Sequence, residues 1–133
     1  MKRLLGVLLL GIMIFGFLYI FEAKTFEINL PAINNLCEIV LKKEDKNINI
    51  NDEATMENII TNLKKVEKTK MSSVSDRPVN AKEIIEIEFK YRDGGSSIVY
   101  IYQRDDKYYL EQAYNGIYNL KQCEYLIIAN YLN

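Results

Sequence analysis

The sequence predicts an α+β protein: an N-terminal transmembrane helix, then one domain with an antiparallel sheet of about five or six strands and two packed helices. Residues 4–21 are apolar and uncharged, several later stretches alternate apolar and polar residues, and two others repeat apolar residues every three or four positions. We therefore divide the chain into a transmembrane anchor (or signal segment) at residues 4–21 and a single extracytoplasmic α+β domain at residues 25–133.

The apolar run at residues 4–21 fits a membrane anchor. As a helix it would rise about 27 Å, close to the roughly 30 Å hydrocarbon core of a bilayer. Lys2 and Arg3 before the run, against a lone Lys24 after it, favour a single-pass protein of the cell membrane with its N-terminus cytoplasmic and its C-terminal domain outside. The alternative is secretion after cleavage, although Phe21 would then occupy the third-last position of a cut after Ala23.

Composition excludes several classes of function. The chain has no histidine, which removes the usual general base and the usual metal ligand. Without Lys2 and Arg3 it has 15 basic and 18 acidic residues, which argues against a nucleic-acid partner. We therefore expect no cofactor, no metal site and no enzymatic activity.

The first half of the domain predicts three strands and one helix. Residues 25–30 alternate polar and apolar side chains up to Pro31, residues 36–41 form a second strand and residues 47–50 a short third one. Asn51 and Asp52 then precede a helix over residues 53–68, and both offer a side-chain oxygen to its first free amides. Its apolar stripe consists of Met56, Ile59, Ile60, Leu63 and Val66.

The second half predicts an antiparallel meander and a closing helix. Residues 85–91 alternate as a half-buried strand, and Asp93-Gly94-Gly95 supplies a hairpin turn. A central strand over residues 97–103 and a third strand from Tyr108 follow. The last helix, residues 119–132, has an apolar stripe of Leu120, Cys123, Ile127 and Tyr131.

The polar loop over residues 68–80 is the first candidate site, because it is longer than most connections in a compact domain. Its candidate binding residues are Ser73, Ser75, Asp76 and Arg77. The alternative is a purely structural connection, since Asp and Ser bond their own backbone and Pro78 presets a turn.

Residues 111–118 are the second candidate site. Asn115-Gly116 is a turn pair that tolerates left-handed geometry. Tyrosines here and on the strands could form an aromatic face, or could simply suit a half-exposed sheet. The candidate binding residues in this region are Tyr109, Glu111, Tyr114 and Asn115.

The two cysteines are open to two interpretations. Cys37 shares a predicted strand face with Ile39 and Leu41, and Cys123 lies on the apolar stripe of the last helix, so both are expected to face the core. They could form a disulfide there, or remain small buried thiols.

Three segments resemble a family of small uncharacterised proteins of Gram-positive bacteria: SVSDRP at residues 73–78, IIEIEFKYRDGG at 84–95 and YYLEQAYNGIY at 108–118. Proteins of this family carry an amino-terminal membrane or export segment and one domain of unknown function. The resemblance spans residues 25–133 and implies location and fold. It supplies no catalytic residue, because the family has no assigned activity.

The favoured hypothesis is a non-catalytic protein-interaction module at the cell surface, held in the membrane through residues 4–21. The alternative is a sensor of a small ligand or cell-wall glycan that uses the tyrosine-rich sheet face. The third hypothesis is a hydrolase with Asp76 and Glu111 as a carboxylate pair.

Overall fold

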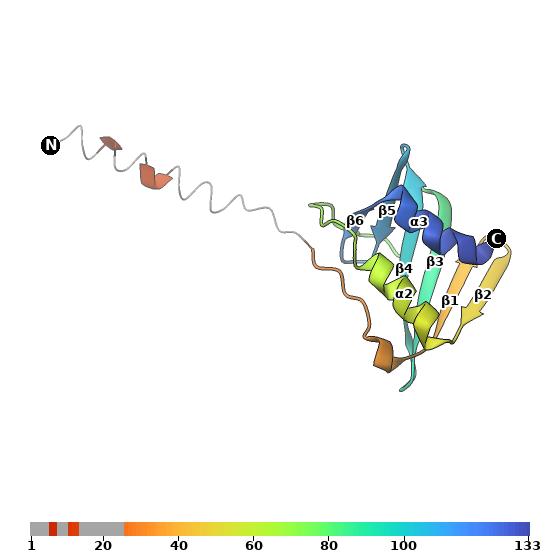
Figure 1. Ribbon diagram of the computed structural model, residues 1–133. Helices are drawn as coiled ribbons and strands as arrows, with labels where there is room; N and C mark the ends of the chain where they lie inside the picture. Colours follow the sequence, from red (N-terminus) through yellow and green to blue (C-terminus); the bar gives the residue numbers. More distant parts are fainter. Residues whose placement is uncertain (1–5, 8–10, 14–25) are drawn as a thin grey trace.

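The structure is a computed structural model that describes residues 6–7, 11–13 and 26–133. Residues 26–133 fold as one unit of strands and short helices (Figure 1). In chain order its elements are η1 (Ile33–Asn35), β1 (Leu36–Lys43), β2 (Lys46–Ile50), α2 (Glu53–Leu63), β3 (Lys82–Tyr91), β4 (Ser96–Arg104), β5 (Lys107–Glu111), β6 (Ile117–Leu120), α3 (Gln122–Ala129) and η2 (Asn130–Leu132).

The six strands form one antiparallel sheet in the order β2-β1-β3-β4-β5-β6. A β1–β2 hairpin makes one edge, and the meander from β3 to β6 ends at the other. Figure 1 shows α2 and α3 side by side across one face of this sheet, running in opposite directions. The predicted α+β class, with an antiparallel sheet and two packed helices, is therefore confirmed.

The core lies between the sheet and the two helices. Each strand alternates its side chains between this face and the opposite one, which we call the open face. The helices contribute the apolar stripe of α2 and, from the C-terminal segment, Tyr125, Ile128 and Leu132. The sheet contributes, among others, Ile39, Leu41, Ile85, Ile87, Phe89, Ile101, Leu110 and Tyr118.

The predicted transmembrane helix at residues 4–21 falls mostly outside the described residues. Within the described ranges, no helix combines the length and the apolar character needed to span a bilayer.

The predicted strand at residues 25–30 is wrong for the described residues 26–30, which have no regular secondary structure. A side chain replaces the missing strand pairing there. The Gln112 amide accepts a hydrogen bond from the Asn29 backbone N at 3.0 Å and donates to the Asn29 carbonyl at 2.7 Å. The backbone N–H and carbonyl of Asn29 are thereby hydrogen-bonded without a neighbouring strand.

Both predicted helices were too long. Of the two predicted capping residues, Asn51 and Asp52, it is Asp52 that caps α2, with its carboxylate accepting from Thr55 N at 2.9 Å. The helix ends at Leu63 and not at residue 68. Residues 119 and 120 belong to β6, because Asn119 and Leu120 pair with β5. The last helix therefore begins only at Gln122.

Candidate functional site

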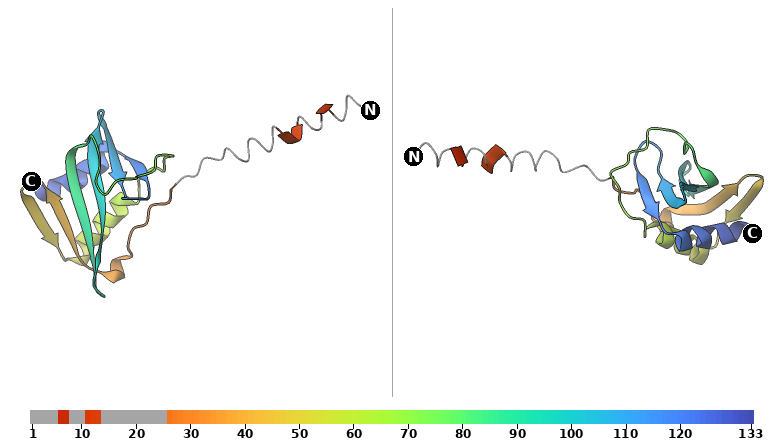
Figure 2. Two further views of the ribbon diagram at one scale, coloured as in Figure 1. Left: turned by 180° about the vertical axis from the view of Figure 1, so that it is seen from behind. Right: turned by 90° about the horizontal axis from the view of Figure 1, so that it is seen from above.

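A long connection, which we call the strap (residues 64–81), joins α2 to β3. It first follows the free edge of β6, where Glu67 pairs with Asn119 and Ser72 with Gly116. It then crosses the open face, on the side of the sheet away from the helices (Figure 2). The strap thus covers a strand edge that could otherwise pair with another chain.

A buried carboxylate fastens the strap to the sheet. Glu111 on β5 is 3% exposed, and its two oxygens accept hydrogen bonds from the Ser73 hydroxyl at 2.6 Å and the Tyr102 hydroxyl at 2.9 Å. Burial and the bond to Glu111 raise the pKa of Tyr102. Each carboxylate oxygen has a donor, as burial of such a group requires.

Arg104 makes a second attachment at the end of β4. Its guanidinium carbon lies over the Tyr102 ring, 5.1 Å from the ring centroid. The same carbon lies 5.9 Å from the centroid of the Tyr109 ring. Its Nη2 donates to the Val79 carbonyl of the strap at 2.6 Å. The cation therefore joins the two stacked tyrosines to the strap at the point where the strap approaches β3.

The outer surface of the strap presents polar and aromatic groups. The Tyr114 hydroxyl donates to Asp76 Oδ1 at 2.6 Å, and this bond raises the pKa of Tyr114. Arg77 lies 5.9 Å from the centroid of the Tyr100 ring, which is buried beneath it. The carbonyl of Ser75 lies 3.4 Å from the oxygen of the Ser73 hydroxyl, whose proton is donated to Glu111. Asp76, Arg77 and Tyr114 thus share one exposed surface.

The turn at residues 112–116 supports this surface from below. Asn115 Nδ2 donates to the Glu27 carbonyl at 2.9 Å and to Gln112 Oε1 at 2.7 Å. The left-handed residue is Tyr114, with φ of 57°, and not the predicted Asn115-Gly116 pair. Gly116 is needed for a different reason, because a Cβ there would lie 2.7 Å from the Cβ of Phe26.

The part of the open face beyond the strap carries an array of ion pairs. Lys42 contacts Glu86 at 3.1 Å and Glu88 at 2.9 Å, and Lys90 contacts Glu38 at 2.8 Å. The bond from Lys42 lowers the pKa of Glu88. Where this array meets the strap, a hollow of about 460 Å³ is bordered by Arg77, Lys42 and Glu86.

The predicted site residues fall into two layers. Asp76, Arg77 and Tyr114 are exposed on the outside, and Ser75, next to Asp76, is half-buried. Glu111 lies beneath them in the buried attachment. Tyr109 stacks beside Tyr102, with the ring centroids 5.8 Å apart, and Asn115 holds the turn at residues 112–116. Sequence reasoning missed Arg104 and Gln112, although Arg104 follows Tyr100 and Tyr102 at the two-residue spacing of the same strand face.

The predicted burial of both cysteines, and the disulfide considered between them, are wrong. Cys37 and Cys123 are free and exposed. The register of β1 against β3 shifts between Leu36 and Glu38, so a β-bulge puts Leu36 into the core in place of Cys37. In α3 the buried residues are Glu124, Tyr125 and Ile128, which turns Cys123 outward.

The acidic side chains considered for metal binding or hydrolysis can be placed in the described part of the chain. In that part of the chain, no group of three or more His, Cys, Asp or Glu side chains lies close enough to hold a metal ion. The two carboxylates considered as a hydrolytic pair are both engaged, Asp76 with Tyr114 and Glu111 with two buried hydroxyls. The strap is thus a loop joined to the sheet by hydrogen bonds, with an exposed outer surface.

Comparison with known proteins gives a family and a fold. The model of the family DUF5301, "Domain of unknown function (DUF5300)", matches residues 24–119. The solved structure "NMR structure of the protein from Ruminococcus gnavus" is similar, with a TM-score of 0.63 and 23% sequence identity, over 76% of this chain and 99% of that one. No curated protein matches the chain.

Proposed function

We propose a non-catalytic protein-interaction role for this chain, which belongs to DUF5301, a family of domains of unknown function. The observation that carries the proposal is the strap. A buried carboxylate, two tyrosines and an arginine hold this long loop in one shape, while its outer side stays open to solvent. A loop that is already ordered loses little conformational entropy when it binds a partner.

The outer surface of the strap, together with Tyr114 of the neighbouring turn, has the composition of a protein-binding site. Val74, Tyr114 and Val79 are 79%, 69% and 57% exposed, and Arg77, between the two valines in the sequence, is exposed as well. Tyrosine and arginine are the side chains most often responsible for binding energy at interfaces, because they combine apolar area with directional hydrogen bonds. We assign the binding surface to Val74, Asp76, Arg77, Val79 and Tyr114.

The location we propose is the outer face of the cell membrane, with residues 4–21 as the anchor and the domain outside. Its support is the length and apolar character of the run, and the basic residues Lys2 and Arg3 before it. Release of the domain after cleavage of this segment is the alternative.

A sensor of glycans or small ligands that uses the tyrosine face is the second candidate. Its rings on β4 are Tyr100 and Tyr102, which are 5% and 0% exposed beneath the strap. A ligand would reach them only after the strap had moved, so the exposed strap surface supports the protein-interaction role more directly.

Site-specific photo-crosslinking of the full chain in cells tests the proposal. A photoreactive residue is placed in turn at Arg77, at Tyr114 and, as the matched control, at Arg92, an exposed arginine after β3. We expect one discrete protein adduct from Arg77 and Tyr114 that is absent from Arg92. The double variant Arg77→Ala, Tyr114→Ala should then abolish association with that protein. Association unchanged in the folded double variant would refute the assignment of the site.

A further inference from the structure

The outer side of α3 is apolar and carries no charge. Leu126 and Ile127 are 45% and 39% exposed, and Cys123 is exposed beside them. The single charged residue of α3, Glu124, is 5% exposed and accepts a hydrogen bond from the Lys121 backbone N at 3.1 Å. A surface helix of a small domain normally has charged residues on its outer side, so this helix has the exterior of an interface helix.

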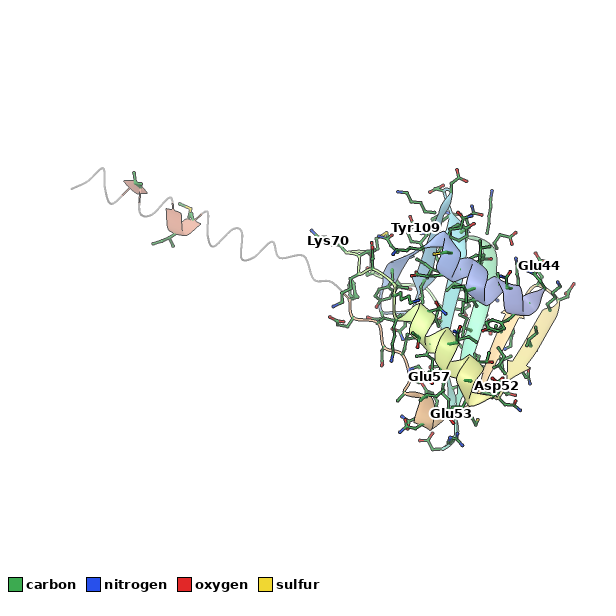
Figure 3. All side chains as sticks on the ribbon, viewed as in Figure 1. Glu44, Asp52, Glu53, Glu57, Lys70 and Tyr109 are labelled. Carbon is green, nitrogen blue, oxygen red and sulfur yellow. The ribbon has the colours of Figure 1, made fainter. Side chains whose placement is uncertain are left out.

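The neighbouring helix α2 has the opposite character. Its outer side carries the exposed acids Glu53 and Glu57 in its first half, which Figure 3 labels near the start of the helix. The exposed Lys64 and Lys65 follow directly after its last turn. The outer surface of the helix layer therefore consists of a neutral apolar strip next to a strip that is acidic at one end and basic at the other.

We propose that two copies of this chain associate through the outer surface of α2 and α3, with α3 packed antiparallel against α3 of the second copy. A two-fold interface places the same patch on both subunits, so the patch must complement itself. The neutral strip of α3 does so without repulsion between like charges.

The charges on α2 select this arrangement. The two-fold axis of this arrangement crosses α3 between Leu126 and Ile127 and makes the two α3 helices antiparallel. The same axis also places α2 opposite α2 of the second copy, again in antiparallel orientation. Glu57 of one copy then faces the end of α2 that carries the partner's Lys64. A parallel arrangement of the α3 helices would move the two α2 helices to opposite sides of the interface and lose this complementarity.

The antiparallel arrangement makes a distinct prediction about distances. About that axis, Cys123 lies opposite the partner's Asn130. The two Cys123 residues are separated by seven helical positions, which is about 10.5 Å along the axis at 1.5 Å per residue. A disulfide requires Cα atoms about 4.4–6.8 Å apart, so Cys123 can bond a cysteine at position 130 of the second copy and not its own equivalent.

Disulfide trapping in the full chain, reconstituted in lipid vesicles, tests the proposal. One tagged copy carries Cys37→Ser and retains Cys123; a second, with a different tag, carries Cys37→Ser, Cys123→Ser and Asn130→Cys. After oxidation with copper phenanthroline, we expect the mixed disulfide between the two copies to exceed either homodisulfide. Absence of the mixed species, as expected if another protein covers this face, or a predominant Cys123–Cys123 disulfide, would overturn the proposal.

A matched pair of variants ties the crosslink to the α3 surface. Leu126→Asp in both copies should reduce the mixed disulfide about tenfold or more, because it puts two carboxylates into the apolar contact. Ile98→Asp makes the same chemical change on the open face, at a residue that is 36% exposed, and should leave the yield unchanged. The strap takes no part in this contact, so the double variant Arg77→Ala, Tyr114→Ala should crosslink like the parent chain whatever the outcome of the strap experiment.

Discussion

The Ser73 hydroxyl donates a 2.6 Å hydrogen bond to the buried carboxylate of Glu111, and so joins the strap to β5 across 38 positions of the chain. The other carboxylate oxygen accepts from Tyr102 on β4. One side chain thus connects the strap to both strands beneath it. This attachment explains how a segment with so little secondary structure of its own keeps a fixed course over the sheet.

Glu111→Ala should destabilise the domain by about 2–3 kcal/mol, because it leaves the buried hydroxyls of Tyr102 and Ser73 without an acceptor. Chemical denaturation of the purified chain measures the change. Hydrogen exchange should accelerate first at residues 72–76, where the strap would be released. Glu38→Ala is the control, since Glu38 pairs with Lys90 on the open face and its loss should cost less than about 1 kcal/mol. Equal effects of the two substitutions would contradict the role given to Glu111.

Tyr102 should make the free energy of unfolding decrease as the pH rises in the alkaline range. Burial, assisted by the bond to Glu111, raises its pKa in the folded state above the ordinary value of 10.0. The folded state therefore retains a proton that the unfolded chain loses. The stability contribution is complete below about pH 10 and falls by about 1.4 kcal/mol per pH unit above it, until the folded tyrosine itself ionises.

Denaturation midpoints measured at intervals between pH 9 and pH 11.5 check this expectation. Tyr102→Phe should be less stable than the parent at pH 8, because it loses the bond to Glu111, and should lose stability less steeply above pH 10. Parallel curves for the two proteins would show that Tyr102 titrates normally.

The strands and the start of α2 could be predicted because their signals are local. Apolar and polar side chains alternate over residues 85–91 because only one face of that strand is covered. Asp52 caps α2 by accepting a hydrogen bond from a residue three positions away. The burial of Glu111 was not predictable in this way. It depends on the strap passing over β5, and on donors at Ser73 and Tyr102 that the fold alone brings together.

The errors at the cysteines have equally physical causes. The bulge at Cys37 arises from the register of β1 against β3, a contact between residues more than 50 positions apart. In α3 the periodicity could not show which side faces the core, because Leu126, Ile127 and Ile128 are apolar on every side of the helix. Asn119 and Leu120 were assigned to this helix because a four-residue strand has too little alternation to be recognised before its partner β5 is known.

Cys37 and Cys123 should remain unlinked within one chain. Alkylation after denaturation without reductant should label both thiols, as measured by intact mass, since both are free. Cys37→Ser and Cys123→Ser should each change the free energy of unfolding by less than about 0.5 kcal/mol, as is usual for exposed positions. A peptide in which the two residues are joined would contradict this prediction.

Lys42 should stabilise the open face only while its partners are ionised. Lys42→Ala leaves Glu86 and Glu88 without their shared cation and should cost about 1 kcal/mol or less at neutral pH, because the Lys42 side chain is 39% exposed. The bond to Lys42 depresses the pKa of Glu88 below 4.5, so this contribution exists above that pH and disappears as the pH falls through the folded pKa. The stability difference between parent and variant should therefore shrink as the pH falls below 4.5 and vanish once the pH is below the folded pKa of Glu88, and a difference independent of pH would point to a loss of packing.

Gly116→Ala should destabilise the domain although the backbone there is not left-handed. An added Cβ would lie 2.7 Å from the Cβ of Phe26 and 3.0 Å from the Tyr118 hydroxyl, so residue 26 must move away from the turn. Overpacking of this kind costs about 1–3 kcal/mol. In a Phe26→Gly background the nearest clash is removed, and the same substitution should cost measurably less. Unfolding free energies of the four proteins in this cycle measure the coupling between the two residues. A cost that is equal in both backgrounds would show that residue 26 does not rest on the turn, and that the segment entering the domain is held there by the hydrogen bonds of Glu27 and Asn29.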